Sequence, residues 1–126
     1  MLADLAGKCD VVLIDAPCSG SGTWRRNPET RWRLDPARLK QVVELQARLL
    51  DISAEMVAPG GHLVYAVCSL IGSEGRGQMA AFLERHAGWQ VDLPTVGAGR
   101  TEGSGILLTP EHDRTDGFFF ARLRKL

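Results

Sequence analysis

The chain reads DVVLIDAPCSG over residues 10–20, a short apolar run that gives way to small, turn-forming residues. The run lacks the two-residue alternation of a half-exposed strand, which favours a strand covered on both faces. A second run, GHLVYAVCS over residues 61–69, ends in the same manner. If both are parallel strands, their carboxyl ends share one edge of the sheet, where open α/β folds build their sites. We therefore expect Cys18, Cys68 and Asp15 to converge there.

The segment between the two runs has the pattern of a long amphipathic helix. Asp35 suits the N-cap and Pro36 the first helical position. Apolar residues then recur at three- and four-residue steps as far as residues 59–61, Pro-Gly-Gly, which we expect to stop the helix. A second strand over residues 62–67 and a second helix over about residues 73–86 follow. This alternation of strand and helix predicts a right-handed crossover and a parallel sheet.

The last third of the chain has weaker patterns. Residues 89–93 and 117–123 are expected to form short strands, and residues 94–116, rich in Gly, Thr and Pro, a surface loop. Within that loop, GAGRTEG over residues 97–103 looks like a nucleotide-binding glycine loop. Because no strand–turn–helix unit surrounds it, we interpret it as part of the loop.

The composition is typical of one soluble globular domain. Of the 126 residues, 44% are hydrophobic and 24% charged, and fifteen basic side chains balance fifteen acidic ones. Overall charge therefore gives no sign of nucleic-acid binding. Residues 24–48 are locally basic, with seven basic against three acidic residues, and arginines flank Trp24 and Trp32 in a manner that suits RNA. A solvated loop and helix face explains the same charges.

The cysteines and histidines argue against a disulfide-stabilised protein and against a metalloprotein. Three cysteines without a CxxC spacing and three scattered histidines do not favour a disulfide framework or a metal site. A reducing cytoplasm is the expected location, since no apolar signal segment stands at the amino terminus. No run reaches the roughly 18 apolar residues of a membrane span.

The cysteines that follow the two strands are candidate nucleophiles. A thiolate is a strong nucleophile and forms most readily in a partly exposed, electropositive setting. Cys68 ends a strand just before a helix whose first amides favour an anion, and Cys18 precedes a flexible Ser-Gly-Ser-Gly segment that lets a ligand approach. The alternative for both is a buried, inert thiol. Cys9, before the first strand, is expected to be structural.

Asp15 ends an apolar run, where an ionised carboxylate is costly unless something pairs with it. This position favours a functional role, such as accepting from an amine of a base or holding a cationic or hydroxyl-bearing cofactor. The competing interpretation is a cap for the turn over residues 16–20.

Several motifs match a known family. They are DAPCSGSGT over residues 15–23, RRNPE over 25–29, the pair Leu45-Gln46, GGHLVYAVCS over 60–69 and TDGFFFA over 115–121. With them the chain resembles the Sun/Fmu-type (RsmB-like) family of RNA cytosine-5 methyltransferases over nearly its whole length. The resemblance implies an α/β fold, the carboxyl-terminal half of a Rossmann-like class I methyltransferase, mainly parallel with an antiparallel last strand. Residues 1–126 would then form one partial catalytic domain.

The resemblance also implies an enzymatic reaction. S-adenosylmethionine would be the methyl donor and RNA, in particular ribosomal RNA, the substrate. Cys68 matches the family's nucleophile, which adds to carbon-6 of cytosine and makes carbon-5 nucleophilic. Cys18 matches the cysteine that assists elimination of the methylated base. DNA cytosine methyltransferases use the Pro-Cys cysteine as nucleophile instead, so the presence of both thiols discriminates between the two groups.

Four further site residues follow from the same resemblance. Asp15 matches a carboxylate placed between cofactor and base, and the carbonyl group of Pro17 would face the cytosine amino group. Arg25 and Arg26 match substrate-binding positions. A target base must be unstacked to reach such a site, which favours single-stranded or flexible RNA.

The chain departs from the family in two respects. Val67 stands where the family usually has Thr, and the family's glycine-rich cofactor loop has no counterpart. We therefore expect a fragment of a larger methyltransferase that binds the cofactor weakly or not at all on its own. The missing strands would leave one sheet edge unpaired, so self-association is also expected. The alternative is a catalytically inactive fragment, or a silent RNA-binding or interaction module that uses residues 24–48.

Overall fold

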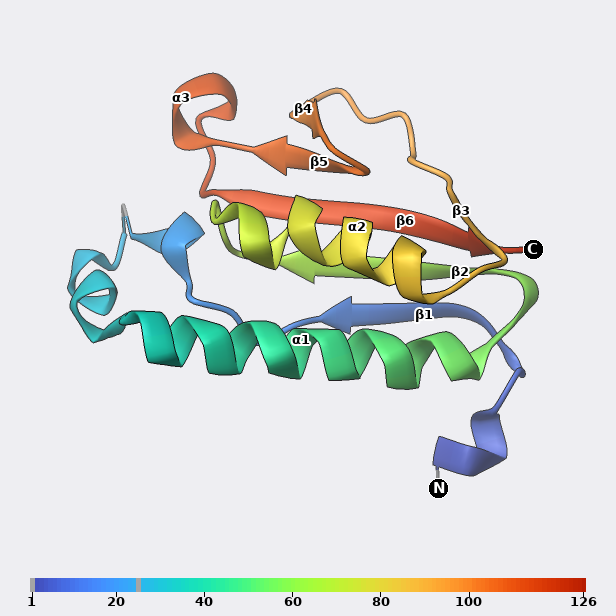
Figure 1. The fold of residues 1–126 in the computed structure, drawn as a ribbon. Coiled ribbons are helices and arrows are strands. Elements are labelled where there is room, and N and C mark those ends of the chain that lie inside the picture. Colours follow the sequence, from blue (N-terminus) through green and yellow to red (C-terminus); the bar gives the residue numbers. More distant parts are fainter. Residues whose placement is uncertain (1, 25) are drawn as a thin grey trace.

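The computed structural model describes residues 2–24 and 26–126, which form one sheet with helices packed against it (Figure 1). The strands are β1 (Cys9–Asp15), β2 (Val57–Val67), β3 (Trp89–Val91), β4 (Arg100–Glu102), β5 (Gly105–Leu108) and β6 (Phe118–Lys125). The helices are α1 (Pro36–Met56), α2 (Arg76–Arg85) and α3 (Pro110–Asp113), and 3-10 turns are η1 (Leu2–Leu5), η2 (Ser21–Thr23), η3 (Pro28–Arg33) and η4 (Gly72–Glu74).

The sheet confirms the fold class expected from the sequence. Its strand order is β1-β2-β6-β5-β4, and β3 also pairs with β6. The strands β1 and β2 are parallel, with Asp15 beside Ala66, and α1 makes the crossover between them. The last strand, β6, runs antiparallel to β2, as expected for the carboxyl-terminal half of a Rossmann-like fold. The carboxyl ends of β1 and β2 therefore lie side by side.

The predicted end of the long helix is wrong by a few residues. The helix begins as expected, with the Asp35 side chain accepting from the Arg38 amide at 2.7 Å. It ends at Met56, however, and residues 59–61 lie inside β2. Gly60 has a φ of 82°, and the register between β1 and β2 shifts beside it. The Pro-Gly-Gly segment thus shapes a bulge in the strand rather than stopping the helix.

The prediction of a loop over residues 94–116 is wrong as well. This segment forms the hairpin β4–β5 and the short helix α3, and β5 extends the sheet beside β6. Strands of three or four residues are too short to show a period in the sequence. Gly105 lies against the ring of Phe119, where a Cβ atom would come within 2.2 Å of Cζ, so only glycine fits. The hairpin adds antiparallel strands to the sheet that the sequence did not predict.

The core lies between the sheet and one layer formed by α1 and α2. Its fully buried members include Leu50 of α1, Met79 and Phe82 of α2, and Leu63 and Tyr65 of β2.

The opposite face of β1 is open in the described part of the chain. Val11 is 59% and Leu13 67% exposed. The prediction that this strand is covered on both faces is therefore wrong for these residues.

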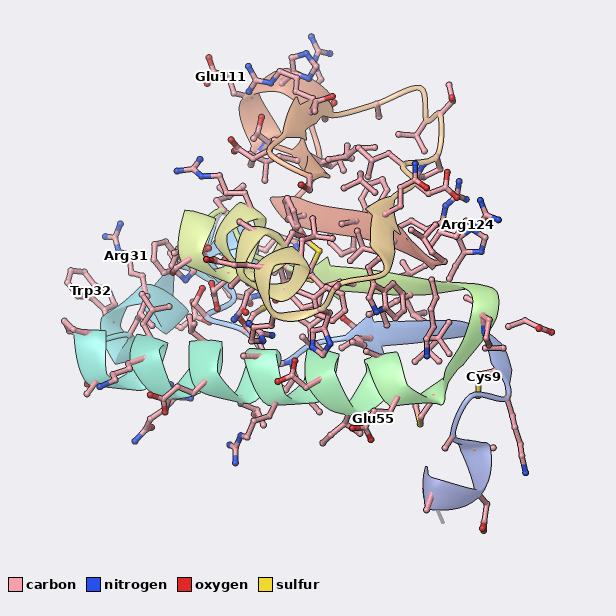
Figure 2. The ribbon with its side chains drawn as sticks, turned by 45° about the vertical axis from the view of Figure 1, so that its right-hand side comes forward. Cys9, Arg31, Trp32, Glu55, Glu111 and Arg124 are labelled. Atoms are coloured by element: carbon pink, nitrogen blue, oxygen red, sulfur yellow. The ribbon has the colours of Figure 1, made fainter. Side chains whose placement is uncertain are left out.

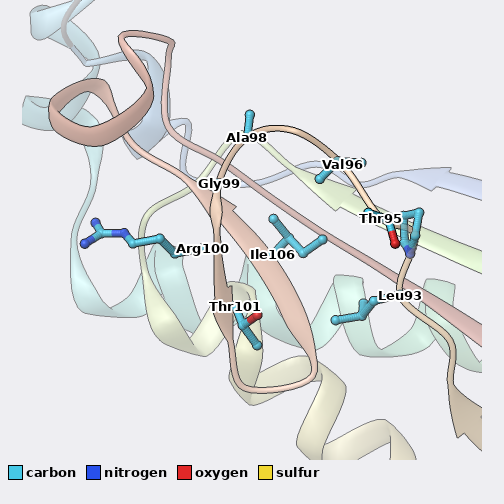
Figure 3. Close-up of a pocket in the computed structure, with 9 residues that line it drawn as sticks. Leu93, Thr95, Val96, Ala98, Gly99, Arg100, Thr101 and Ile106 are labelled. Atoms are coloured by element: carbon cyan, nitrogen blue, oxygen red, sulfur yellow. The ribbon is translucent and has the colours of Figure 1, made fainter.

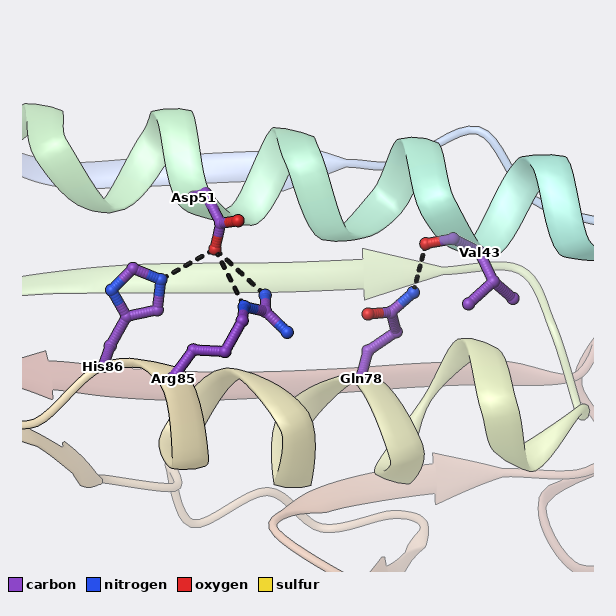
Figure 4. Close-up of polar contacts among 5 residues, drawn as sticks. All are labelled: Val43, Asp51, Gln78, Arg85 and His86. Carbon is purple, nitrogen blue, oxygen red and sulfur yellow. Dashed lines mark hydrogen bonds and ion pairs between the residues drawn. The ribbon is translucent and has the colours of Figure 1, made fainter.

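Polar contacts join the two helices of this layer (Figure 4). Asp51 of α1 lies 2.7 Å from the ring of His86 and 3.0 Å from the guanidinium of Arg85. Further along, the Gln78 amide donates to the Val43 carbonyl at 2.7 Å. Partial burial opposes ionisation of Asp51, but the contacts with His86 and Arg85 outweigh it and hold the pKa of this carboxyl below its ordinary value.

We predict that Asp51→Asn destabilises the protein in a pH-dependent way. A pKa lowered by folding gives stability that is present above about pH 4 and is lost as the pH falls through the folded value. Because the Asp51 side chain is 44% exposed, solvent screens the contacts and the loss at pH 7 is at most about 1 kcal/mol. Urea unfolding of both proteins at pH 7 and pH 3 measures this. The difference in the free energy of unfolding between the two proteins should shrink at the lower pH. Glu55 is an exposed carboxylate on the same helix (Figure 2), and Glu55→Gln should leave the free energy of unfolding unchanged at both pH values.

Candidate active site

The two cysteine loops lie at the carboxyl ends of β1 and β2. Cys68 follows β2 directly, and Cys18 lies three residues after the end of β1. The Cys18 thiol is close enough to Cys68 to interact with both its backbone and its thiol, and the charge of Asp15 acts on the Cys68 thiol. Both cysteines are free and half-buried. The structure thus brings Cys18, Cys68 and Asp15 together at one edge of the sheet.

Hydrogen bonds tie the two loops to each other. The Gly22 amide donates to the Cys68 carbonyl at 3.0 Å. The hydroxyls of Ser21 and Ser69 lie 3.1 Å apart, and the Leu70 amide donates to the Ser21 hydroxyl at 2.8 Å. Ser21 and Ser69 are buried, so these bonds are shielded from water. Backbone and serine hydrogen bonds therefore join the two loops directly.

A third segment, just before β6, closes on the same loops. The Gly117 amide donates to the Gly22 carbonyl at 2.7 Å, and a Cβ atom on Gly22 would lie 2.0 Å from the Gly117 carbonyl oxygen. Only glycine allows this approach. Beside it, the Arg26 guanidinium forms an ion pair with Asp116 at 2.7 Å. Arg25, the other expected substrate-binding arginine, lies outside the described residues.

The environment raises the pKa of both thiols. For Cys18 burial is the main cause and the charge of Glu74 adds to it, while backbone hydrogen bonds at Gly20 and Cys68 act in the opposite direction. For Cys68 burial again comes first, followed by the negative charges of Asp15 and Asp116, and Arg26 opposes them. The thiol form of both cysteines is thus favoured at neutral pH.

Two expectations about neighbouring groups need correction. Asp15 is exposed, so the cost of burying a carboxylate does not apply to it here. The amides after Cys68 do not lie at the start of a helix, because η4 intervenes and α2 begins only at Arg76. The Ile71 amide donates instead to the Ser69 hydroxyl at 3.0 Å. The Pro17 carbonyl accepts from the Gln46 amide at 2.8 Å, a contact that the sequence did not predict.

Sequence reasoning also missed a set of buried polar side chains beneath the loops. Glu74 and Gln46 are 0% exposed, and both contact the loops. Gln46 stands among Leu and Val on the core-facing stripe of α1. A polar side chain at such a position needs a buried partner, and this is the signal that could have indicated the set.

The glycine-rich segment at residues 97–103 lies elsewhere. It borders an open cavity of about 210 Å³ lined by Leu93, Val96, Gly99, Arg100, Thr101 and Ile106 (Figure 3). Because Arg100–Glu102 is the strand β4 of a hairpin, the segment does not form a phosphate-binding turn before a helix. Among the described residues, no three His, Cys, Asp or Glu side chains are grouped as metal ligands. No described helix is long and apolar enough to cross a membrane.

The chain is similar to several known proteins in sequence and in fold. Residues 2–124 match the family described as 16S rRNA methyltransferase RsmB/F. The chain is 43% identical over 121 residues to a probable ribosomal RNA small subunit methyltransferase B of Synechocystis, covering 92% of this chain and 27% of that one. It is 42% identical over 120 residues to ribosomal RNA small subunit methyltransferase B of Thermus thermophilus, and this match covers 91% of this chain and 29% of that one.

Solved structures give the same picture. A crystal structure of a protein named PH0851 matches with a TM-score of 0.89 and 35% identity over 95% of this chain and 27% of that one. NSun6 from Pyrococcus horikoshii, solved with SFG, matches with a TM-score of 0.85 and 26% identity. The match covers 98% of this chain and 32% of that one. The chain spans between a quarter and a third of the length of these proteins. On its sequence, its fold and the match over residues 2–124, the chain belongs to the RsmB/F family of 16S rRNA methyltransferases.

Proposed function

We propose that this chain carries the catalytic portion of a cytosine-5 methyltransferase that acts on ribosomal RNA with S-adenosylmethionine as donor. The observation that carries the proposal is the pair Cys18 and Cys68, held beside each other at the ends of two parallel strands. The relatives are named for methylation of ribosomal RNA, and SFG, an analogue of S-adenosylmethionine, was bound to one structural neighbour. These names support both the substrate class and the cofactor.

The proposed reaction divides the work between the two thiols. The Cys68 thiolate forms a bond to carbon-6 of cytosine, which gives carbon-5 the electron density of an enamine. S-adenosylmethionine, when bound, supplies the electrophilic methyl group. Cys18 then assists removal of the proton from carbon-5. Once Cys18 has lost its own proton, its thiolate accepts the carbon-5 proton, and the electrons of the broken C–H bond expel Cys68 from carbon-6 as a thiolate and restore the ring. Because burial, Asp15 and Asp116 raise the pKa of Cys68, its attack depends on transfer of the thiol proton to an acceptor.

The neighbouring groups fit a base and a cofactor beside these thiols. The Pro17 carbonyl uses one lone pair for Gln46, which leaves the second for a cytosine amino group. Asp15 presents an exposed carboxylate at the end of β1, which suits a cationic or hydroxyl-bearing cofactor. The Arg26 guanidinium is paired with Asp116 and its charge acts on the Cys68 thiol, and a cation at this place suits RNA phosphate.

A second candidate function is RNA binding without catalysis. Trp32 is 77% exposed, and the Arg31 guanidinium lies over its ring at 4.7 Å from the centroid (Figure 2). An exposed indole beside a cation is a suitable surface for stacking an unpaired base. This function needs neither thiol, so the chemistry of Cys68 separates the two candidates.

Covalent trapping tests the leading proposal. RNA that contains 5-fluorocytosine has no proton at carbon-5 of the modified base, so an adduct formed after methyl transfer cannot eliminate. The chain is incubated with this RNA and cofactor in two formats. In the first it is alone, and in the second it is complemented by a polypeptide that comprises the part of a full-length relative to which this chain has no match. We expect a covalent adduct in the complemented reaction that Cys68→Ser abolishes and Cys9→Ser leaves unchanged.

Two other results of this experiment would decide against the proposal. An adduct that persists in the Cys68→Ser protein rules out this thiol as the attacker. No adduct in either format, together with salt-sensitive RNA binding that Trp32→Ala weakens, identifies the silent binding module instead.

Asp15→Asn is predicted to change two readouts in opposite directions. Loss of its charge lowers the pKa of the Cys68 thiol, so alkylation of Cys68 by iodoacetamide at pH 8 becomes faster and its rate profile moves to lower pH. If Asp15 also contacts the cofactor and the base, methyl transfer in the complemented reaction falls by on the order of a hundredfold. Asp10 is an exposed carboxylate at the other end of the same strand, so Asp10→Asn is the matched control and should leave both readouts unchanged. Unchanged methyl transfer in Asp15→Asn contradicts its proposed role.

We also propose that the isolated chain associates with a second copy through β1. This strand is at one end of the strand order, and Val11 and Leu13 are exposed on it. An unpaired edge with apolar side chains favours pairing with another chain. Light scattering over a concentration series should show a rising mass that Leu13→Lys reduces. A constant monomer mass for the unmodified chain contradicts the proposal.

A further inference from the structure

The carboxylate of Glu74 is fully buried and accepts hydrogen bonds from neutral donors. One oxygen accepts from the Ser19 amide at 2.7 Å and from the Gln46 amide at 3.2 Å. The other accepts from the Ser19 hydroxyl at 2.7 Å and from the Ser69 hydroxyl. All four donors thus converge on one side chain that has no exposed surface.

These donors lie directly beside the two cysteines. Ser19 follows Cys18 in the chain, and Ser69 follows Cys68. The same Gln46 amide that reaches Glu74 also donates to the carbonyl of Pro17, the residue before Cys18. One carboxylate is therefore hydrogen-bonded to the residue that follows each cysteine. Through Gln46 it is also linked to Pro17, the residue that precedes Cys18.

The arrangement is better suited to positioning than to stability. A buried charge is costly to remove from water, and an apolar side chain of similar size often packs at least as favourably. What an apolar side chain does not provide is an acceptor for the half-buried Ser19 and the buried Ser69, whose donors would lose their partner. Hydrogen bonds to a charged acceptor are also shorter and stronger than those between neutral groups. Glu74 can therefore hold two short, serine- and glycine-rich loops more firmly than neutral contacts would.

We infer that Glu74 is a positioning residue that couples the loops of Cys18 and Cys68, so that both thiols keep one mutual placement. That this placement serves one cytosine ring rests on the function proposed above. The coupling of the two loops by Glu74 does not depend on that function. A change at Glu74 or in one of the two loops therefore alters the reactivity of both thiols, and the third cysteine reports whether the effect is local. Cys9 begins β1, at the end of the strand far from the site (Figure 2).

The test measures iodoacetamide alkylation of the three cysteines by peptide mass spectrometry, without RNA or cofactor. Glu74→Ala removes the common acceptor, so the rates at Cys18 and Cys68 should both rise by about tenfold as the loops open, with Cys9 unchanged. Glu74→Gln should raise the Cys68 rate much less than Glu74→Ala does, because a neutral side chain of the same shape keeps part of the hydrogen bonding. Its carbonyl oxygen can accept from the Ser19 amide, and its amide can donate to the two serine hydroxyls. At Cys18 the lost charge also lowers the pKa of the thiol, so Cys68 is the clearer reporter of the loop contacts.

Two further variants keep the inference falsifiable if Glu74→Ala does not fold. Ser19→Ala removes one donor on the Cys18 loop, and coupling through Glu74 predicts a faster rate at Cys68 as well as at Cys18. Leu50→Ala lowers stability in the core without touching the carboxylate, and should raise all three rates together. The inference is overturned if Ser19→Ala affects Cys18 alone, if Glu74→Gln behaves like Glu74→Ala at Cys68, or if Glu74→Ala changes Cys9 as much as the other two. Because alkylation requires neither substrate nor cofactor, these outcomes are independent of the trapping result.

Discussion

The hydrogen bonds of the buried Glu74 carboxylate are the interaction on which the arrangement of the site depends. The sheet brings the ends of β1 and β2 together, but parallel pairing alone does not set where the residues beyond the strands lie. Ser19 and Ser69 complete that placement because each donates to the same carboxylate. The chain thus uses a desolvated charge, a costly group in a core, where two loops need a common anchor.

Close packing of backbone explains much of the sequence pattern around the thiols. Gly22 and Gly117 lie so near to each other that neither can carry a side chain, and Gly117 also lies against Leu70. The Ser-Gly-Ser-Gly and Asp-Gly-Phe motifs are therefore parts of one contact although almost a hundred residues separate them in the chain. Gly22 and Gly117 thus serve the closure of the site around Cys68.

The sequence predicted the elements with strong local signals and missed those set by tertiary contacts. The run before Asp15 and the capped helix from Pro36 were identified because apolar runs bounded by turn residues and helix caps are visible in neighbouring residues. The hairpin β4–β5 was missed because its strands are short and depend on pairing with β6. The partners of Glu74 were missed for a similar reason, since they lie 5 to 55 residues away and no local pattern joins them. The placement of the cysteines followed from the fold, whereas the exposure of Asp15 did not.

The central claim is that two adjacent thiols have different tasks, with Cys68 forming the covalent bond and Cys18 assisting its release. The most direct measurement uses ordinary cytosine RNA, cofactor and the complemented chain, and maps any RNA-linked peptide by mass spectrometry. The account predicts that Cys18→Ser accumulates an adduct on the peptide of Cys68, whereas the unmodified chain turns over without one. An adduct on the peptide of Cys18, or release by Cys18→Ser as fast as by the unmodified chain, would contradict it.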